Sequence, residues 1–351
     1  MPLDWLQVAR DLIAIESITG NEEPAVAYIE ARLRDLGLAV RSDEVLPGRR
    51  NLYAGPEQPT VVLCTHTDTV PPYVPLREDD EWLYGRGACD TKGITAAFLA
   101  AGERLLARGV DDVGFLFVVG EEVDNAGARR ANEWLRARYI LVGEPTENRL
   151  AQGHKGILVA RLLATGEACH SAYPELGSSA THRLIAAAAR LLATDFGHDP
   201  VLGQATLNVG TIEGGVAANV LAPSAEARVA LRVVTSIDDA ENKLFAALEA
   251  SQGATAANAA SLAVEILVRM PPAWLATIEG FPTTVVRYGT DVPFLANVGT
   301  PLLYGPGSIH HAHTLDERIE KRSIEQAIDD IVAIVGRLRE GRGIRSPRSG
   351  V

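Results

Sequence analysis

The sequence predicts an α/β fold with a mainly parallel central sheet, interrupted by an inserted α+β unit of ferredoxin-like type. Over the first 150 residues, helical patterns alternate with short apolar runs, which is typical of strands covered by helices. After residue 154 the order becomes strand, helix, two strands, helix and strand, which is the order of a ferredoxin-like unit. We therefore expect a discontinuous domain over 1–153 and 271–351, and an inserted domain over 154–270.

Residues 21–37 carry the clearest helical pattern of the first domain. Asn21 can cap the helix, and Gly37 can take the left-handed conformation that ends it. The apolar positions fall on one face: Val26, Ile29, Leu33 and Leu36.

Three buried strands are expected in the same domain, because three runs are rich in β-branched or aromatic residues and lack polar residues at helical spacing. They are TVVLC (60–64), VGFLFVV (113–119) and YILVG (139–143). Acidic or histidine residues follow each run. Since ligands of open α/β sheets bind at the carboxyl ends of the strands, we expect one region to hold His66, Glu121, Glu122 and Glu144.

The inserted unit is assigned from five segments. In order, they are GILVARLLATG (156–166), a helix near 178–194, two strands across 204–234, a helix near 237–250, and LAVEILVRM (262–270). Pro271 and Pro272 mark the return to the first domain, which closes with a helix from about residue 323.

Composition indicates a soluble globular protein, since 47% of the 351 residues are hydrophobic and 22% are charged. The net charge of -12 disfavours binding to nucleic acid or to anionic membranes. Cys64, Cys89 and Cys169 have no paired spacing, which predicts neither a disulfide framework nor a cysteine zinc site. No signal peptide or membrane-spanning stretch is evident, so we expect a cytoplasmic protein.

Two motifs offer metal ligands. In His66-Thr67-Asp68 the outer side chains share a face of an extended segment, so Asp68 can orient the imidazole of His66. By itself this triplet is also typical of a surface or capping pair. Asp90 lies between glycines before a helix that we expect to begin near Thr91, where it can cap the helix or bridge two cations.

The remaining candidates are carboxylates at strand ends and one distant histidine. Glu121 and Glu122 repel each other unless protons or cations intervene, although a solvated strand end would also accommodate them. If the strand continues, their side chains face opposite ways, so one can bind metal while the other contacts a water molecule. Glu144 adds another oxygen ligand and His313 another imidazole. Each residue alone is more typical of a structural role than of a metal ligand. Their common location at strand ends and loops of one predicted domain favours a metal centre.

Eight segments in this order resemble the M20 family of metallopeptidases and deacylases, particularly its acetylornithine deacetylase and succinyl-diaminopimelate desuccinylase branch. They are CTHTDTVP, YGRGACDTKG, VVGEEVDNAGA, GEPT, GEACHSAYPELGSSA, GGVAANVLAP, YGTDVPFL and GPGSIHHAHTLDE. The resemblance covers nearly the whole chain. It implies a zinc-peptidase-like catalytic domain with an inserted lid and dimerisation domain.

The resemblance also implies two divalent metal ions. His66 and Glu144 would hold one, Glu122 and His313 the other, and Asp90 would bridge them. Their oxygen and nitrogen donors suit zinc, and cobalt or manganese also accept them.

Glu121 is then the general base, which takes a proton from the metal-bridging water and passes it to the leaving nitrogen. Many relatives have an aspartate where this chain has Gly120. That departure leaves both glutamates in place.

In the inserted domain, the resemblance implies that His170 stabilises the tetrahedral oxyanion in the active site of a partner subunit, so we expect a homodimer formed through the lid. Asn219, Gly289 and Thr290 match positions that contact substrate in relatives. Lys155 and Arg232 either bind a substrate carboxylate or are solvated strand charges.

The expected activity is hydrolysis of an N-acyl amino acid, with N-acetylornithine deacetylation in arginine or lysine biosynthesis as the specific reaction. The alternatives are a dipeptidase or carboxypeptidase, succinyl-diaminopimelate desuccinylation, and hydrolysis of a carrier-protein-linked lysine or ornithine. A catalytically silent scaffold is disfavoured because Glu121, His170 and all five ligands are present. We expect a small substrate and neither nucleic acid nor membrane as a partner.

Overall fold

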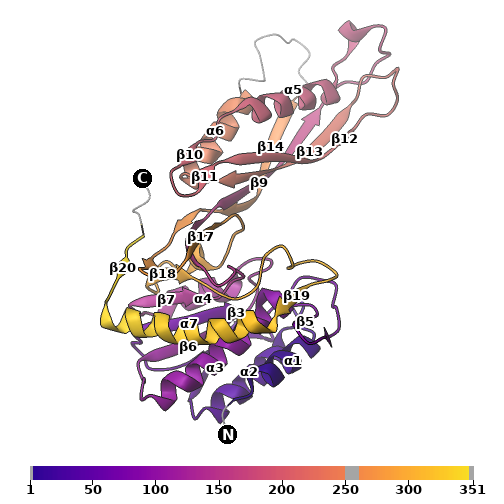
Figure 1. The fold of residues 1–351 in the computed structure, drawn as a ribbon. Coiled ribbons are helices and arrows are strands. Elements are labelled where there is room, and N and C mark those ends of the chain that lie inside the picture. Colours follow the sequence, from indigo (N-terminus) through magenta and orange to yellow (C-terminus); the bar gives the residue numbers. More distant parts are fainter. Residues whose placement is uncertain (1–2, 250–260, 348–351) are drawn as a thin grey trace. The chain divides into compact units, whose positions relative to one another are not determined.

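A computed structural model describes residues 3–249 and 261–347 of the chain. The described residues form two compact units (Figure 1). The first unit comprises 3–153, 274–286 and 290–347, and the second comprises 154–249, 261–273 and 287–289. Each unit is considered by itself below.

The first unit is built on a six-stranded sheet with strand order β1-β2-β6-β3-β7-β18. Its strands are β1 (Val40–Leu46), β2 (Arg49–Ala54), β3 (Val61–His66), β6 (Val113–Val118), β7 (Tyr139–Val142) and β18 (Thr300–Leu303). Strands β6, β3, β7 and β18 run parallel to one another, whereas β1 and β2 pair in antiparallel fashion at one edge. The predicted α/β class is confirmed, and the sheet is mixed because a hairpin extends its parallel part.

Helices cover this sheet and share its core. They are α1 (Trp5–Ala14), α2 (Glu23–Asp35), α3 (Gly93–Ala107), α4 (Ala126–Trp134) and α7 (Lys321–Glu340). α3 and α7 lie side by side, and α1 packs against α3 (Figure 1). Leu63 of β3, Phe98 of α3 and Ile331 of α7 are fully buried in one apolar cluster. The site-bearing strands are therefore anchored by long-range packing.

The predicted cap of α2 was wrong by one residue. The cap is Glu22, whose buried carboxylate pairs with Arg49, and not Asn21. Pro24 lies in the first turn, where its missing N–H costs nothing. At the other end, Gly37 adopts the expected left-handed conformation with φ +78°.

The parallel strands bring their carboxyl ends to one edge of the sheet. His66 at the end of β3 is in register with Val118 at the end of β6, and Cys64 is in register with Val142 at the end of β7. Because parallel strands share a direction, the residues that follow them gather at the same edge. This edge carries the candidate site.

The second unit contains a four-stranded sheet with order β12-β13-β9-β14 and two helices. Its elements are β9 (Gly156–Thr165), α5 (Ala180–Ala193), β12 (Thr206–Gly214), β13 (Ser224–Val233), α6 (Ile237–Glu249) and β14 (Ser261–Met270). All neighbouring strands are antiparallel. This element order and topology match the predicted ferredoxin-like unit, and residue 250 of the expected second helix lies outside the described residues.

Alternate residues of β9 and β13 are buried, as expected for a sheet with one covered face. Leu158 and Leu231 from the sheet pack with Leu184 of α5 and Leu244 of α6. The second unit therefore has an apolar core of its own.

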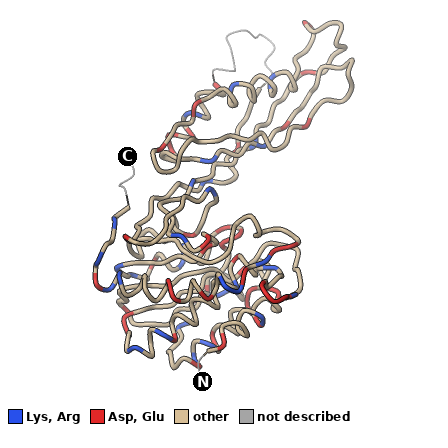
Figure 2. Tube along the Cα trace, viewed as in Figure 1, with Lys and Arg blue, Asp and Glu red and all other residues tan. Residues whose placement is uncertain are grey.

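Short elements complete the chain. The strands are β4 (Arg77–Glu78), β5 (Trp82–Tyr84), β8 (Leu150–His154), β10 (His198–Asp199), β11 (Gly203–Gln204), β15 (Ala273–Trp274), β16 (Thr277–Ile278), β17 (Thr283–Val286), β19 (Arg318–Glu320) and β20 (Ile344–Arg345). The short turns of helix are η1 (Ala88–Lys92), η2 (Pro174–Leu176) and η4 (Val292–Leu295). Both signs of charge are interspersed along the trace of each unit (Figure 2). Within 3–249 and 261–347, no helix has the length and apolar character required to cross a membrane.

Candidate metal centre

Three predicted ligands from three different segments meet at the sheet edge. His66 ends β3, Asp90 lies in the turn η1 before α3, and Glu122 follows β6. One potential ligand atom from each lies within 4.8 Å of the others. His66 Nε2 is 3.0 Å from Asp90 Oδ1. Asp90 is not the cap of α3, because the helix begins at Gly93.

His313 joins this group from the far end of the chain. Its Nε2 lies 3.3 Å from Asp90 Oδ2 and 3.1 Å from Glu122 Oε1. The two oxygens of Asp90 therefore face different histidines. This geometry suits a carboxylate that bridges two cations.

The spacing and chemistry of these donors fit divalent metal ions. Two ligands that each lie about 2.0–2.1 Å from a tetrahedral zinc are about 3.3 Å apart. The contacts of His66 and His313 with Asp90 and Glu122, at 3.0–3.3 Å, are close to that separation. Imidazole nitrogen and carboxylate oxygen are also the donors that zinc, cobalt and manganese accept.

The fifth predicted ligand, Glu144, follows β7 and is buried. Burial raises the pKa of its carboxyl well above the ordinary value, and the nearby charge of Asp90 raises it further. The structure thus places Glu144 within electrostatic reach of Asp90, although it does not join the close contacts of His66, Asp90, Glu122 and His313.

The centre holds more negative charge than its surroundings neutralise. Burial raises the pKa of Glu121 well above normal, with the charge of Glu144 as the next cause, and burial also raises the pKa of Glu122. Hydrogen bonds to Asp90 and Glu122 raise the pKa of His313 to about 10. Burial opposes the charged form of His66, but its hydrogen bonds with Asp68 and Asp90 outweigh burial and raise its pKa. Positive charge is needed here, as metal cations would provide.

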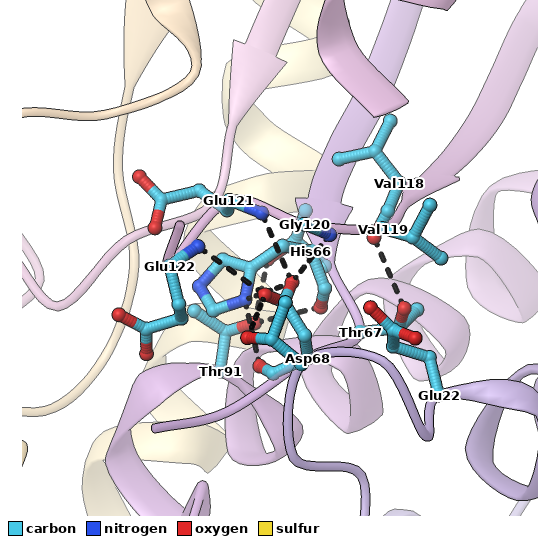
Figure 3. Close-up of polar contacts among 12 residues, drawn as sticks. Glu22, His66, Thr67, Asp68, Thr91, Val118, Val119, Gly120, Glu121 and Glu122 are labelled. Carbon is cyan, nitrogen blue, oxygen red and sulfur yellow. Dashed lines mark hydrogen bonds and ion pairs between the residues drawn. The ribbon is translucent and has the colours of Figure 1, made fainter. Parts of the chain in front are cut away.

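Asp68 contacts both His66 and the loop that carries the two glutamates. His66 Nδ1 donates to the backbone oxygen of Asp68 at 2.9 Å, whereas the carboxylate of Asp68 is 3.6 Å away. That carboxylate accepts the backbone N–H groups of Gly120, Glu121 and Glu122 at 3.0, 3.1 and 3.2 Å (Figure 3). It also accepts the hydroxyl of Thr19. Asp68 therefore fixes the loop that carries both glutamates, while its carbonyl orients His66.

Several residues at this centre were missed by the sequence reasoning. Glu317 is buried, accepts the backbone N–H of Asp90 at 3.1 Å, and pairs with Arg86 at 2.6 Å. Asn125 and Asp291 are joined by a 3.0 Å hydrogen bond beside the glutamate loop. No pattern predicted these pairings because the partners lie far apart in the chain. The sequence signals that could have indicated them are Glu317, an additional acid near His313, and Asn125, an asparagine in the turn after Glu122.

In the second unit, the predicted residues His170 and Asn219 lie on neighbouring exposed segments. His170 forms an isolated bridge with Val220, and the backbone oxygen of Asn219 accepts the N–H of Ser171 at 2.9 Å. The ring nitrogen Nδ1 of His170 accepts the N–H of Ala172. The structure therefore brings both predicted residues together in this unit.

The second unit holds the two predicted cations, Lys155 and Arg232, and a third one near Lys155, Arg287, which the sequence did not single out. Lys155 is only 6% exposed and its Nζ donates to the carbonyl of Gln204 at 2.6 Å. Burial lowers the pKa of Lys155, and the charges of Arg287 and Arg232 lower it further. Burial also lowers the pKa of Arg232. Among the described residues, none of these three cations forms an ion pair, so an anion would stabilise the group.

The last predicted pair, Gly289 and Thr290, has mainly local contacts. Thr290 is fully buried and its hydroxyl accepts the N–H of Val292 at 3.2 Å. A Cβ at Gly289 would lie 2.2 Å from the sulfur of Met270. These residues shape the turn that leads into Asp291.

Comparison with known families gives a match over most of the chain. A model described as peptidase family M20/M25/M40 matches residues 62–337. A peptidase M20 domain-containing protein of Schizosaccharomyces pombe is 37% identical over 330 residues, which cover 90% of this chain and 80% of the relative. An Aspergillus clavatus protein named "probable carboxypeptidase" is 36% identical over 363 residues, which cover 92% of this chain and 80% of the relative.

Solved structures share the fold. A tripeptidase of Staphylococcus aureus has a TM-score of 0.81 at 22% identity, with 96% of this chain and 98% of the other covered. A dinuclear metal-binding peptidase of Bacillus subtilis has a TM-score of 0.65 at 14% identity, with 94% and 97% covered.

Proposed function

The chain belongs to the peptidase family M20/M25/M40, and on this premise we propose that it is a di-metal exopeptidase that releases the C-terminal residue of short peptides. The observation that carries hydrolysis is the placement of Asp90 between two histidines, with Glu121, Glu122 and Glu144 around it. The names of the relatives favour the carboxypeptidase alternative over acetylornithine deacetylation.

The roles at the centre follow from the contacts. His66 and Glu144 would hold one ion, Glu122 and His313 the other, and Asp90 both. When bound, zinc or a similar cation would polarise the scissile carbonyl and make the attacking water more acidic. Glu121 lies on the same loop as Glu122, in the electrostatic field of Glu144 and His66.

Glu121 is the proposed base. It accepts the proton of the water and returns it to the leaving nitrogen, so that the amine departs neutral.

The substrate's free carboxylate is assigned to the cations of the second unit. Lys155 lies in the electrostatic field of Arg232 and Arg287, and none of the three has a carboxylate partner among the described residues. Charge-assisted hydrogen bonds from such groups discriminate a carboxylate from an amide. A peptide with a free C-terminus meets this requirement, and a C-terminally amidated peptide does not.

We also propose that residues 154–270 form a lid and dimerisation domain. On the outer face of α5, Ile185 and Leu192 are 57% and 62% exposed, and Ile212 of the edge strand β12 is 53% exposed. An apolar helix face beside an unpaired strand edge suits a second copy of this chain. In this homodimer His170 would act on the partner's substrate.

A substrate comparison tests the proposal. The purified chain is supplied with zinc, cobalt or manganese and given Ala-Gly-Phe, its C-terminal amide, N-acetylornithine and N-succinyl-diaminopimelate. We expect release of phenylalanine from the free tripeptide, with loss of activity on chelation and recovery on adding metal. Release of alanine would identify an aminopeptidase, and cleavage of N-acetylornithine alone would restore the deacetylase reading. Activity that survives chelation would overturn the metal mechanism.

A further inference from the structure

The loop that carries Glu121 and Glu122 is fixed at both ends. At its start, the carboxylate of Asp68 accepts three successive backbone N–H groups. At its end, the N–H of Asn125 donates to the carbonyl of Gly120 at 2.7 Å, which closes the turn. The two glutamates thus lie within a closed, hydrogen-bonded segment.

Asn125 has an unusual backbone and a buried amide. Its φ is +55°, in the left-handed region that asparagine tolerates better than most residues, and it is 5% exposed. Its Nδ2 group donates to the backbone oxygen of Glu121 at 3.3 Å and to Asp291 Oδ1 at 3.0 Å. One side-chain amide therefore connects the backbone of Glu121 to a distant acid.

Asp291 reaches the loop from the later part of the first unit, after 165 intervening residues. It is 1% exposed, and burial raises its pKa to about 6 while the bond from Asn125 partly opposes that shift. Among the described residues, only Asn125 donates a hydrogen bond to its carboxylate. A buried carboxylate with such limited compensation is costly, so its retention at this place needs a reason.

We propose that Asp291 and Asn125 are positioning residues that fix Glu121 for proton transfer. Asp291 holds the amide of Asn125, and the amide holds the carbonyl of Glu121, so this pair adds a second hold on the base besides Asp68. The inference rests on the proposed role of Glu121 as the base. A small displacement of a catalytic group lowers the rate while leaving substrate binding intact, because proton transfer requires hydrogen-bond geometry.

The test compares Asp291→Ala, Asp291→Asn and Asn125→Gly in the full chain loaded with metal. Glycine keeps the positive φ of residue 125 and removes only the amide. We expect Asp291→Ala and Asn125→Gly to lower kcat about 10- to 100-fold, with KM and metal content unchanged. Asp291→Asn keeps the acceptor oxygen and should recover most of kcat. Asp111→Ala, at an exposed aspartate of the same unit, is the matched control.

A second background separates this inference from the proposed function. If Asp291 acts through Glu121, then Asp291→Ala should lower kcat no further in a Glu121→Gln enzyme. Multiplicative losses, or a fall in metal content with Asp291→Ala, would overturn the positioning role while leaving the base in place. Normal turnover by Glu121→Gln alone would instead remove the proposed base, and the positioning role with it.

Discussion

The two units differ in the sign of the charged groups that they bring together. The first gathers Asp90, Glu122 and Glu144 around two histidines. The second gathers Lys155, Arg232 and Arg287 with no carboxylate paired to them in the described residues. Asp90, Glu144 and Lys155 are buried, and a buried charge without a partner is costly, so each group would gain from a counter-charge. In the proposed mechanism, metal cations would supply the counter-charge of the first group, and the substrate carboxylate would supply that of the second.

The strongest test of this contrast removes one negative charge from the first unit without removing a ligand. Glu121→Gln should lower kcat about 100- to 10,000-fold, because the amide cannot accept the proton of the attacking water. Metal content, measured by elemental analysis, should stay at two ions per chain. Glu325→Gln, an exposed site on α7, is the control. Loss of metal in Glu121→Gln would make Glu121 a ligand.

His170 tests whether the second unit takes part in the reaction at all. Removal of an oxyanion donor typically costs about 100- to 1,000-fold in kcat, so we expect His170→Ala to show a loss of that order with unchanged metal content. His182→Ala, at another exposed histidine of this unit, should retain normal activity.

Mixed dimers then test the proposed action across subunits. Chains with Glu121→Gln and chains with His170→Ala should together regain activity, since one hybrid site is intact. Equal inactivity of the mixture and of its components would contradict an intersubunit role.

His154 provides a second comparison between the units. It is a buried histidine of the second unit whose pKa is lowered, whereas the pKa values of His66 and His313 in the first unit are raised. Burial lowers the pKa of His154 to about 4, so between pH 6.5 and pH 4 only the unfolded chain takes up its proton. The free energy of unfolding therefore falls as the pH falls through this window, by about 3 kcal/mol in total from this group. Urea titrations at several pH values should show that His154→Gln loses this component. His198→Gln, at an exposed position, should keep it.

The smallest expected effect concerns the cations of the second unit. Arg232→Ala or Lys155→Met should raise KM for the free tripeptide about 10- to 100-fold with little change in kcat, because a hydrogen bond to a charged group contributes about 1.5–3 kcal/mol. Steady-state kinetics with Arg228→Ala, an exposed arginine of β13, provide the comparison. If the KM for the free tripeptide stays normal, the substrate carboxylate binds elsewhere.

The fold was largely predictable from the sequence. Strands β3, β6 and β7 and the order of elements in the second unit follow from apolar periodicity, which reports burial directly. The antiparallel hairpin of β1 and β2 was not predicted, since its edge strand is mostly exposed and lacks a continuous apolar run. The α2 cap was missed because a buried ion pair overrides the usual preference for asparagine.

At the metal centre, the nearness of His66 and Glu122 was predictable because parallel strand ends converge. Asp90 lies in the turn η1 and follows no strand of that sheet, so its place beside them was implied only by the family resemblance. The contacts that support these ligands were not predictable from the sequence. Asn125 with Asp291 and Glu317 with Asp90 join distant segments through single side chains, and neither pair has a periodicity that a sequence can display. Arg287 was missed for the same reason, since it lies far in the sequence from Lys155, whose pKa its charge lowers.

The late position of His313 has a consequence for synthesis of the protein. His66 and His313 are 247 residues apart, so at 5–20 residues per second roughly 12–50 s separate their emergence during translation. Until His313 emerges, Asp90 lacks one of its two histidines and Glu122 lacks its histidine contact, while the whole second unit is made. The second unit, with its own apolar core, can fold in that time. The nascent chain can therefore complete the candidate metal centre only after the second unit has been made.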